Sequence, residues 1–69
     1  MAISGRRHHS SLEWYAYLHV EGTVHTKRFL GDMGDIREAQ LSPFVSRVTG
    51  PFEAKNKDIA DDIAKARLR

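Results

Sequence analysis

Residues 13–30 read EWYAYLHV (13–20), EG (21–22) and TVHTKRFL (23–30), and they carry the strongest local structural signal in the sequence. Both flanking runs are rich in aromatic and β-branched residues, which favour strands. The connection between them contains Gly22, which can adopt the positive φ that a tight turn requires. We therefore predict a β-hairpin.

The register of this hairpin depends on the length of its loop. A two-residue loop places Trp14 opposite Phe29, whereas a three-residue loop places it opposite Leu30. In both registers one face of the first strand is wholly apolar and should be core: Trp14, Ala16, Leu18 and Val20. The other face should be at least partly exposed and carries Tyr15, Tyr17 and His19.

A short helix and a third strand follow the hairpin. Asp35 and Glu38 have the spacing of a capping box, which predicts a helix of one to two turns through Gln40. The residue before Pro43 is biased away from helical angles, so the helix should end there. Residues 44–49 (FVSRVT) predict the third strand, which Gly50-Pro51 should break. Residues 52–54 are then either a bulged continuation of this strand or the entry to the last helix.

The last helix has clear start signals. Asn56 is a good N-cap, and Asp58 lies in the first turn, where the helix dipole favours an acid. The pattern runs to about Leu68, with an expected ion pair between Asp61 and Lys65. Its apolar stripe consists of Ile59, Ala60, Ile63, Ala64 and Ala66.

Together these elements predict the α+β class, in the order β-β-α-β-α. We expect a small antiparallel three-stranded sheet with a β-hairpin, a short middle helix and one C-terminal helix packed on the sheet. The domain should span residues 12–69, and residues 1–11 should form a disordered basic tail because they have no apolar periodicity. The predicted core consists of Trp14, Ala16, Leu18, Val20, Val48, Ile59 and Ile63.

The composition suits a small globular protein. The chain has no cysteine, so it has neither disulfides nor a thiolate metal site. No apolar run approaches the ~20 residues of a membrane span, and no signal peptide is evident. We expect a cytoplasmic protein without membrane contact, as a monomer or a homodimer, because association adds buried area to small domains.

No residue pattern indicates catalysis, a metal or a cofactor. The serines lack a nucleophile-elbow context, and no phosphate loop occurs. His19 and His25 lie on facing strands, but a metal needs three or four ligands, and the other histidines, His8 and His9, lie in the tail. We therefore expect a non-enzymatic binding module.

The first functional hypothesis is weak, salt-dependent association with nucleic acid. The net charge of +2 comes from Arg6 and Arg7, since 11 − 2 leaves nine basic against nine acidic residues in the rest of the chain. Aromatic and basic side chains on an exposed sheet can stack bases and attract phosphates, although such pairs are also ordinary cross-strand partners. The predicted contacts are Arg6, Arg7, Tyr15, Tyr17, Lys27, Arg28 and Arg47.

A family resemblance points the same way. Three segments carry it: Trp14-x-Ala16-Tyr17-Leu18-x-Val20-x-Gly22, then Lys27-Arg28-Phe29-Leu30-Gly31, then Phe52-x-Ala54 leading into the last helix. In these segments the chain resembles the AP2-type and integrase arm-binding DNA domains. The resemblance implies a sheet that reads the major groove, with Tyr15, Lys27 and Arg28 as DNA contacts. Residues 32–51 depart from it, because the family has only a short third strand there.

The alternative is a protein-interaction module, such as a small regulator, inhibitor or adaptor. Small proteins of this kind are also common products of phages and mobile elements. Residues 31–51 form a long segment with apolar side chains in a loop-rich setting, and loops on a rigid scaffold often carry recognition. The same segment could instead simply cover the second face of the sheet. The predicted contacts are Met33, Ile36, Leu41 and Phe44.

Overall fold

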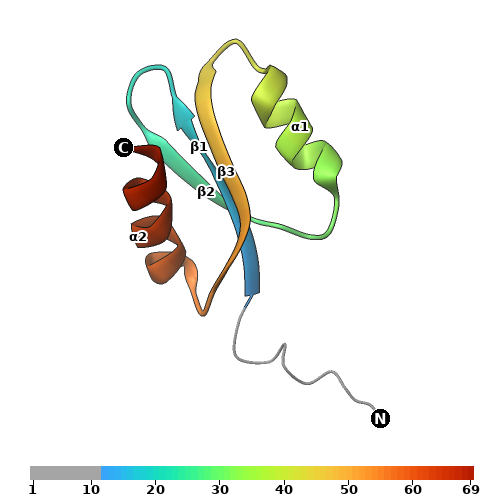
Figure 1. The fold of residues 1–69 in the computed structure, drawn as a ribbon, viewed down its shortest axis with the longest axis vertical. Coiled ribbons are helices and arrows are strands. Elements are labelled where there is room, and N and C mark those ends of the chain that lie inside the picture. Colours follow the sequence, from blue (N-terminus) through green and yellow to red (C-terminus); the bar gives the residue numbers. More distant parts are fainter. Residues whose placement is uncertain (1–11) are drawn as a thin grey trace.

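The first strand of the chain is the central strand of an antiparallel sheet, in the order β2-β1-β3 (Figure 1). A computed structural model describes residues 12–69, so the predicted tail with Arg6 and Arg7 lies outside the described residues. The elements confirm the predicted class and order: β1 (Leu12–His19), β2 (Val24–Arg28), α1 (Met33–Leu41), β3 (Val45–Ala54) and α2 (Lys57–Leu68). The helices lie on opposite sides of the sheet (Figure 1).

Neither predicted hairpin register is correct. Trp14 lies opposite Arg28, one residue before Phe29. The shift arises because the loop begins at Val20, which leaves the strand and is 56% exposed instead of joining the core.

Hydrogen bonds at the turn explain this register. The amide of Gly22 donates to the carbonyl of His19, and the amide of His19 donates to the carbonyl of Thr23, both at 2.8 Å. Gly22 has a φ of 98°. A three-residue hairpin loop of this kind has a residue with positive φ at its third position. Because Gly22 takes that position, the loop consists of residues 20–22 and begins at Val20.

The main core lies between α2 and the Trp14 face of the sheet. Its buried members are Trp14, Ala16, Phe52, Ala54, Ala60, Ala64 and Leu68, with Leu18, Val24 and Ile63 packed against them. The indole Nε1 of Trp14 donates to the Ala54 carbonyl at 3.0 Å, which joins β1 to the end of β3.

Two further core predictions need correction on α2 and β3. Ile59 is 40% exposed, and Ala66 is exposed, because α2 meets the sheet through the row formed by Ala60, Ala64 and Leu68. Val48 is only half-buried and lies opposite Tyr17, on the other face from Trp14.

Helix α1 starts one turn earlier than predicted. Its N-cap is Asp32, whose carboxylate accepts a hydrogen bond from the amide of Gly34 at 2.8 Å. Asp35 therefore lies in the first turn rather than at the cap. The helix ends at Leu41, and Ser42 has extended angles as expected for the residue before Pro43.

Strand β3 continues through Gly50-Pro51, so the predicted break is wrong. The register with β1 shifts between Trp14 and Ala16, so a bulge lies at Gly50-Pro51, and the proline sits on an edge strand of the sheet. Beyond the bulge the strand delivers Phe52 and Ala54 to the core.

Helix α2 begins and ends as predicted. The Asn56 side chain accepts from the amide of Ile59 at 3.0 Å, and the helix runs to Leu68. Asp61 pairs with Lys57 at 3.3 Å, not with Lys65, so the predicted ion pair is replaced by the other i,i+4 pair of the same carboxylate. No helix among residues 12–69 has the length and apolarity to cross a membrane.

Candidate binding groove

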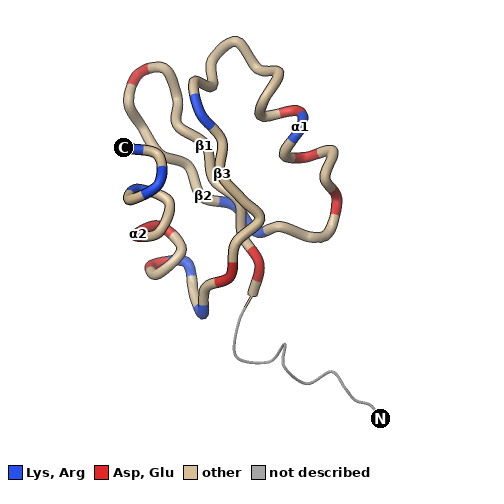
Figure 2. Tube along the Cα trace, viewed as in Figure 1, with Lys and Arg blue, Asp and Glu red and all other residues tan. Residues whose placement is uncertain are grey.

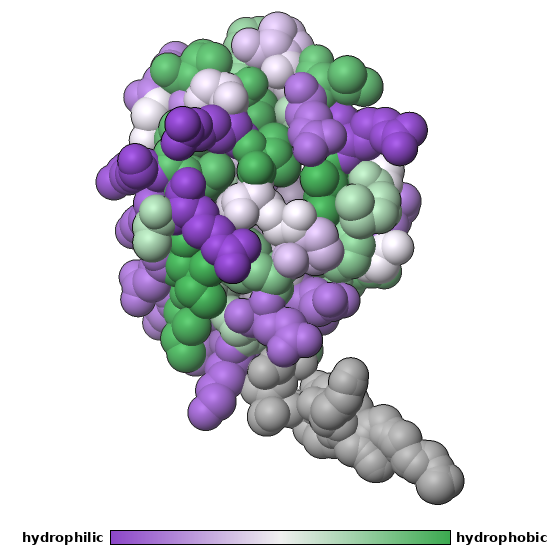
Figure 3. All heavy atoms as spheres, in the orientation of Figure 1, coloured by the Kyte–Doolittle hydropathy of each residue, from purple (hydrophilic) through white to green (hydrophobic). Residues whose placement is uncertain are grey.

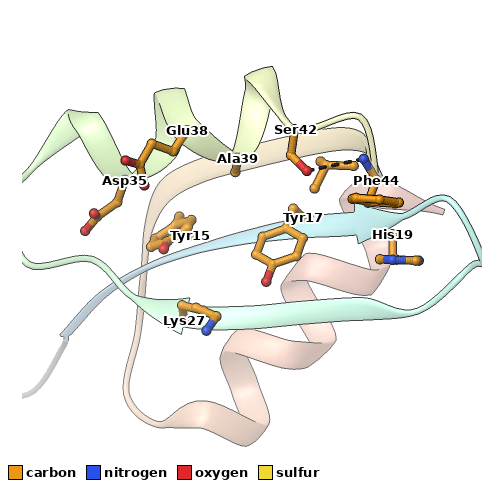
Figure 4. A pocket seen from close by; sticks show the side chains of 10 residues that line it. Tyr15, Tyr17, His19, Lys27, Asp35, Glu38, Ala39, Ser42 and Phe44 are labelled. Carbon is orange, nitrogen blue, oxygen red and sulfur yellow. Dashed lines mark hydrogen bonds between the residues drawn. The ribbon is translucent and has the colours of Figure 1, made fainter.

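A groove crosses the outer face of β1, between α1 and β2 (Figure 4). Helix α1 packs on the β3 side of this face, with Ile36 buried, and leaves the part formed by β1 and β2 uncovered. The groove has a volume of about 360 Å³, which lies in the range of small-ligand sites. Its lining residues are Tyr15, Tyr17, His19, Lys27, Asp35, Glu38, Ala39, Ser42, Phe44 and Val45.

One end of the groove is aromatic. Tyr17 stacks on His25 with 5.1 Å between ring centroids, and His19 lies parallel to Phe44 at 6.2 Å. His19 and His25 meet edge to face at 6.3 Å, so the four rings form one continuous aromatic strip. Phe44 is 62% exposed although its carbonyl is fixed by the amide of Val20 at 2.9 Å. The strip therefore offers an exposed ring on an anchored backbone.

His19 also offers a directed hydrogen-bond donor. Its Nδ1 accepts from the amide of Glu21 at 3.1 Å. The neutral imidazole must then carry its proton on Nε2. A carbonyl oxygen of a ligand is a suitable partner for that proton.

The other end of the groove is acidic. Tyr15 is 8% exposed, and its pKa is raised from 10.0, first by burial and then by the negative charge of Asp35, with smaller effects from Tyr17 and Glu38. The two carboxylates on α1 thus lie near enough to Tyr15 for their charge to act on its phenol. Figure 4 shows both acids above Tyr15, with Lys27 on the opposite side.

These charges are open to a ligand. Lys27 lies opposite Tyr15 in the β1–β2 register, yet it forms no ion pair with Asp35 or Glu38. Within residues 12–69 the one ion pair joins Lys57 and Asp61, on α2. A cationic group entering the groove would meet two carboxylates without displacing a protein cation.

The sheet divides the residues predicted to contact nucleic acid. Tyr15, Tyr17 and Lys27 lie on the groove face, although Tyr15 is buried. Arg28 and Arg47 lie on the opposite face, because they pair with Trp14 and Leu18. The structure therefore does not bring the predicted set onto one surface.

The residues predicted for protein contact also separate. Phe44 lines the groove, and Ile36 is buried beneath α1 with 3% exposure. Met33 and Leu41 are exposed but do not line the groove.

Sequence reasoning missed Asp35 and Glu38 as site residues. It assigned both to helix capping. Their i,i+3 spacing was the available signal, since residues three apart share one face of a helix.

The described part of the chain holds no group of three histidine, aspartate or glutamate side chains placed to bind a metal ion. Neither a protein-family model, nor a curated protein, nor a solved structure matches this chain.

Proposed function

We propose that this chain is a non-enzymatic protein-interaction module whose groove binds an extended segment of a partner protein. The observation that carries the proposal is the combination, within one groove, of an exposed aromatic end and an acidic end whose carboxylates have no cationic partner among residues 12–69. Aromatic rings supply contact area at interfaces, and a carboxylate pair selects a cationic side chain.

The dimensions of the groove set the spacing of the ligand. Tyr15 at the acidic end and His19 at the aromatic end are four residues apart on β1, which is roughly 13 Å at the rise of a strand. An extended peptide has the same rise per residue. The preferred ligand therefore carries an arginine or lysine and, four residues away, a tyrosine, phenylalanine or leucine.

Nucleic acid fits this groove less well. A phosphate backbone would have Lys27 as its one cation among the lining residues and would meet Asp35 and Glu38 at the same end. The aromatic strip could stack a base, but the flanking phosphates would be repelled.

The test is an NMR titration of the amide-labelled protein with a pentapeptide that has arginine first and tyrosine fifth, and with the reversed peptide. Amides of residues 15–19, 25–27 and 35–44 should shift, with a Kd in the millimolar to submillimolar range expected for a small contact. Replacing the arginine of the peptide by glutamate should abolish the shifts.

Matched variants decide whether the groove is responsible. Glu38→Lys should weaken binding about 10-fold or more, which corresponds to ~1.4 kcal/mol. Asp62→Lys makes the same charge change at an exposed position of α2 and should leave binding unchanged. Equal losses in the two variants, or equal binding of the glutamate peptide, would refute the proposal.

A further inference from the structure

Three arginines gather on the α2 side of the sheet, at the end that carries the hairpin turn. Arg47 pairs with Leu18, which places it on this face. Arg67 approaches the Thr49 hydroxyl, with 3.4 Å from Nη1 to Oγ1, and Thr49 lies two residues from Arg47 on the same strand face. Arg69 Nη2 donates to the carbonyl of Gly22 at 3.2 Å. We refer to this group as the arginine surface; it consists of Arg47, Arg67 and Arg69.

Two of these guanidinium groups are held in place by the protein. The guanidinium carbon of Arg67 lies 5.3 Å from the centroid of the Phe52 ring, and this cation–π contact holds the guanidinium group against the sheet. Arg69 is tied to the turn through Gly22. A guanidinium has five N–H donors, so each of these groups keeps donors for a ligand.

No carboxylate neutralises the arginine surface. Across residues 12–69 none of the three arginines forms an ion pair, since the one pair is Lys57–Asp61. The three acids of helix α2, Asp58, Asp61 and Asp62, lie in its first half together with Lys57, whereas its last turn carries only the cations Lys65 and Arg67. Glu21 in the hairpin turn is the acid at this end of the sheet.

The C-terminal end of α2 and part of β3 both carry cations toward one end of the molecule, whereas the start of α2 carries cations as well as acids (Figure 2). Strongly hydrophilic side chains lie among apolar ones on that part of the face in Figure 3.

We propose that the arginine surface binds the phosphate backbone of a nucleic acid strand. Guanidinium groups match phosphate oxygens with paired hydrogen bonds, and three of them lie within one region whose one acid, Glu21, forms no ion pair with them among residues 12–69. The apolar residues beneath them, Phe52 and Leu68, are buried, so the surface offers cations and hydroxyls rather than a pocket for a peptide side chain. A regular polyanion is the partner that fits. This proposal is independent of the groove, which lies on the other face of the sheet.

The experiment measures binding of a fluorescent oligothymidylate of about 12 nucleotides by anisotropy, between about 50 and about 200 mM salt. Three phosphate contacts on a single strand predict a slope of about −2 for log affinity against log salt. Arg47→Gln combined with Arg69→Gln should weaken binding about 10-fold at the lowest salt and bring the slope close to −0.7.

Controls separate the arginine surface from net charge and from the N-terminal arginines. Arg37→Gln with Lys55→Gln removes the same charge at exposed positions elsewhere and should leave affinity within about twofold. In a background that carries Arg6→Gln and Arg7→Gln, the Arg47→Gln and Arg69→Gln substitutions should still weaken nucleic-acid binding by the same factor. Glu38→Lys, in the groove, should not weaken nucleic-acid binding.

Four results would overturn the proposal. They are no binding at the lowest salt, equal losses in the two charge-matched variants, binding that vanishes only with Arg6 and Arg7, and binding of polyglutamate at least as tight as that of the oligonucleotide. Circular dichroism of each variant verifies folding, and Arg67→Lys, which keeps the charge but not the planar fork, should weaken binding while the protein stays folded.

Discussion

Replacing Gly50 by alanine should destabilise the protein far more than replacing Gly22. Gly50 has a φ of 129°, and a Cβ there would lie 2.8 Å from the Cβ and 2.9 Å from the Cα of Tyr15. Gly22 has a φ of 98°, and a Cβ there would meet no atom within 4 Å. The two variants therefore share the backbone strain, and only Gly50→Ala adds a clash with the central strand.

The magnitudes follow from these two terms. A left-handed alanine costs about 1–2 kcal/mol, and the lower entropy of the unfolded alanine chain offsets about 0.4–1 kcal/mol. Gly22→Ala should thus lose about 1 kcal/mol. Overlap with packed backbone adds about 1–3 kcal/mol, so Gly50→Ala should lose about 2–4 kcal/mol.

Urea unfolding followed by the fluorescence of Trp14, the one tryptophan, measures both variants. A loss of 2–4 kcal/mol is a large share of the ~3–10 kcal/mol expected for a domain of this size. Equal midpoints for the two variants would show that β3 does not approach Tyr15 as closely as the structure indicates.

Two further predictions concern the faces of the sheet. Ala64→Leu should lower the free energy of unfolding, measured with urea, by about 1–3 kcal/mol because Ala64 has no exposed surface. Ala66→Leu, at an exposed position of the same helix, should change it by less than about 0.5 kcal/mol. A reversed order of the two variants would contradict the packing of α2. The raised pKa of Tyr15 means that the folded protein holds the phenol proton to a higher pH than the unfolded chain does. The resulting stabilisation is fully present below the ordinary pKa of 10.0, where the phenol is neutral in both the folded and the unfolded protein. It is lost as the pH rises through the raised pKa. Tyr15→Phe should therefore reduce the fall in stability above pH 10, measured as urea midpoint against pH, and an unchanged alkaline slope would refute the assignment.

Local signals predicted most of the fold. The hairpin, the N-cap at Asn56 and the end of α2 at Leu68 each depend on residues close together in sequence. The register failed because both predicted registers kept Val20 in the strand, whereas the hydrogen bonds around Gly22 place Val20 in the loop. The break at Gly50-Pro51 failed because a bulge against β1, a distant strand, keeps β3 in the sheet.

The candidate sites were harder to predict because they depend on which face each residue takes. Lys27 and Arg28 are neighbours in sequence, yet the pleat sends them to opposite faces. The arginine surface joins residues from β3 and α2, and the groove joins β1 with α1, so neither is visible in any local pattern. Tyr15 and Tyr17 were placed on the correct face of β1, although Tyr15 is buried rather than exposed.

The central position of the first strand governs the order in which the chain can fold. The β1–β2 ribbon closes a three-residue loop, an event on the scale of ~1–10 μs, but a lone hairpin is marginal in water. The opposite edge of β1 pairs only with β3, up to the contact between Leu12 and Ala54. Closing that long loop and covering Trp14 with α2 both need the C-terminal half of the domain, so we expect docking of that half to limit the folding rate. During synthesis the apolar face of the hairpin remains uncovered until α2 has left the ribosome.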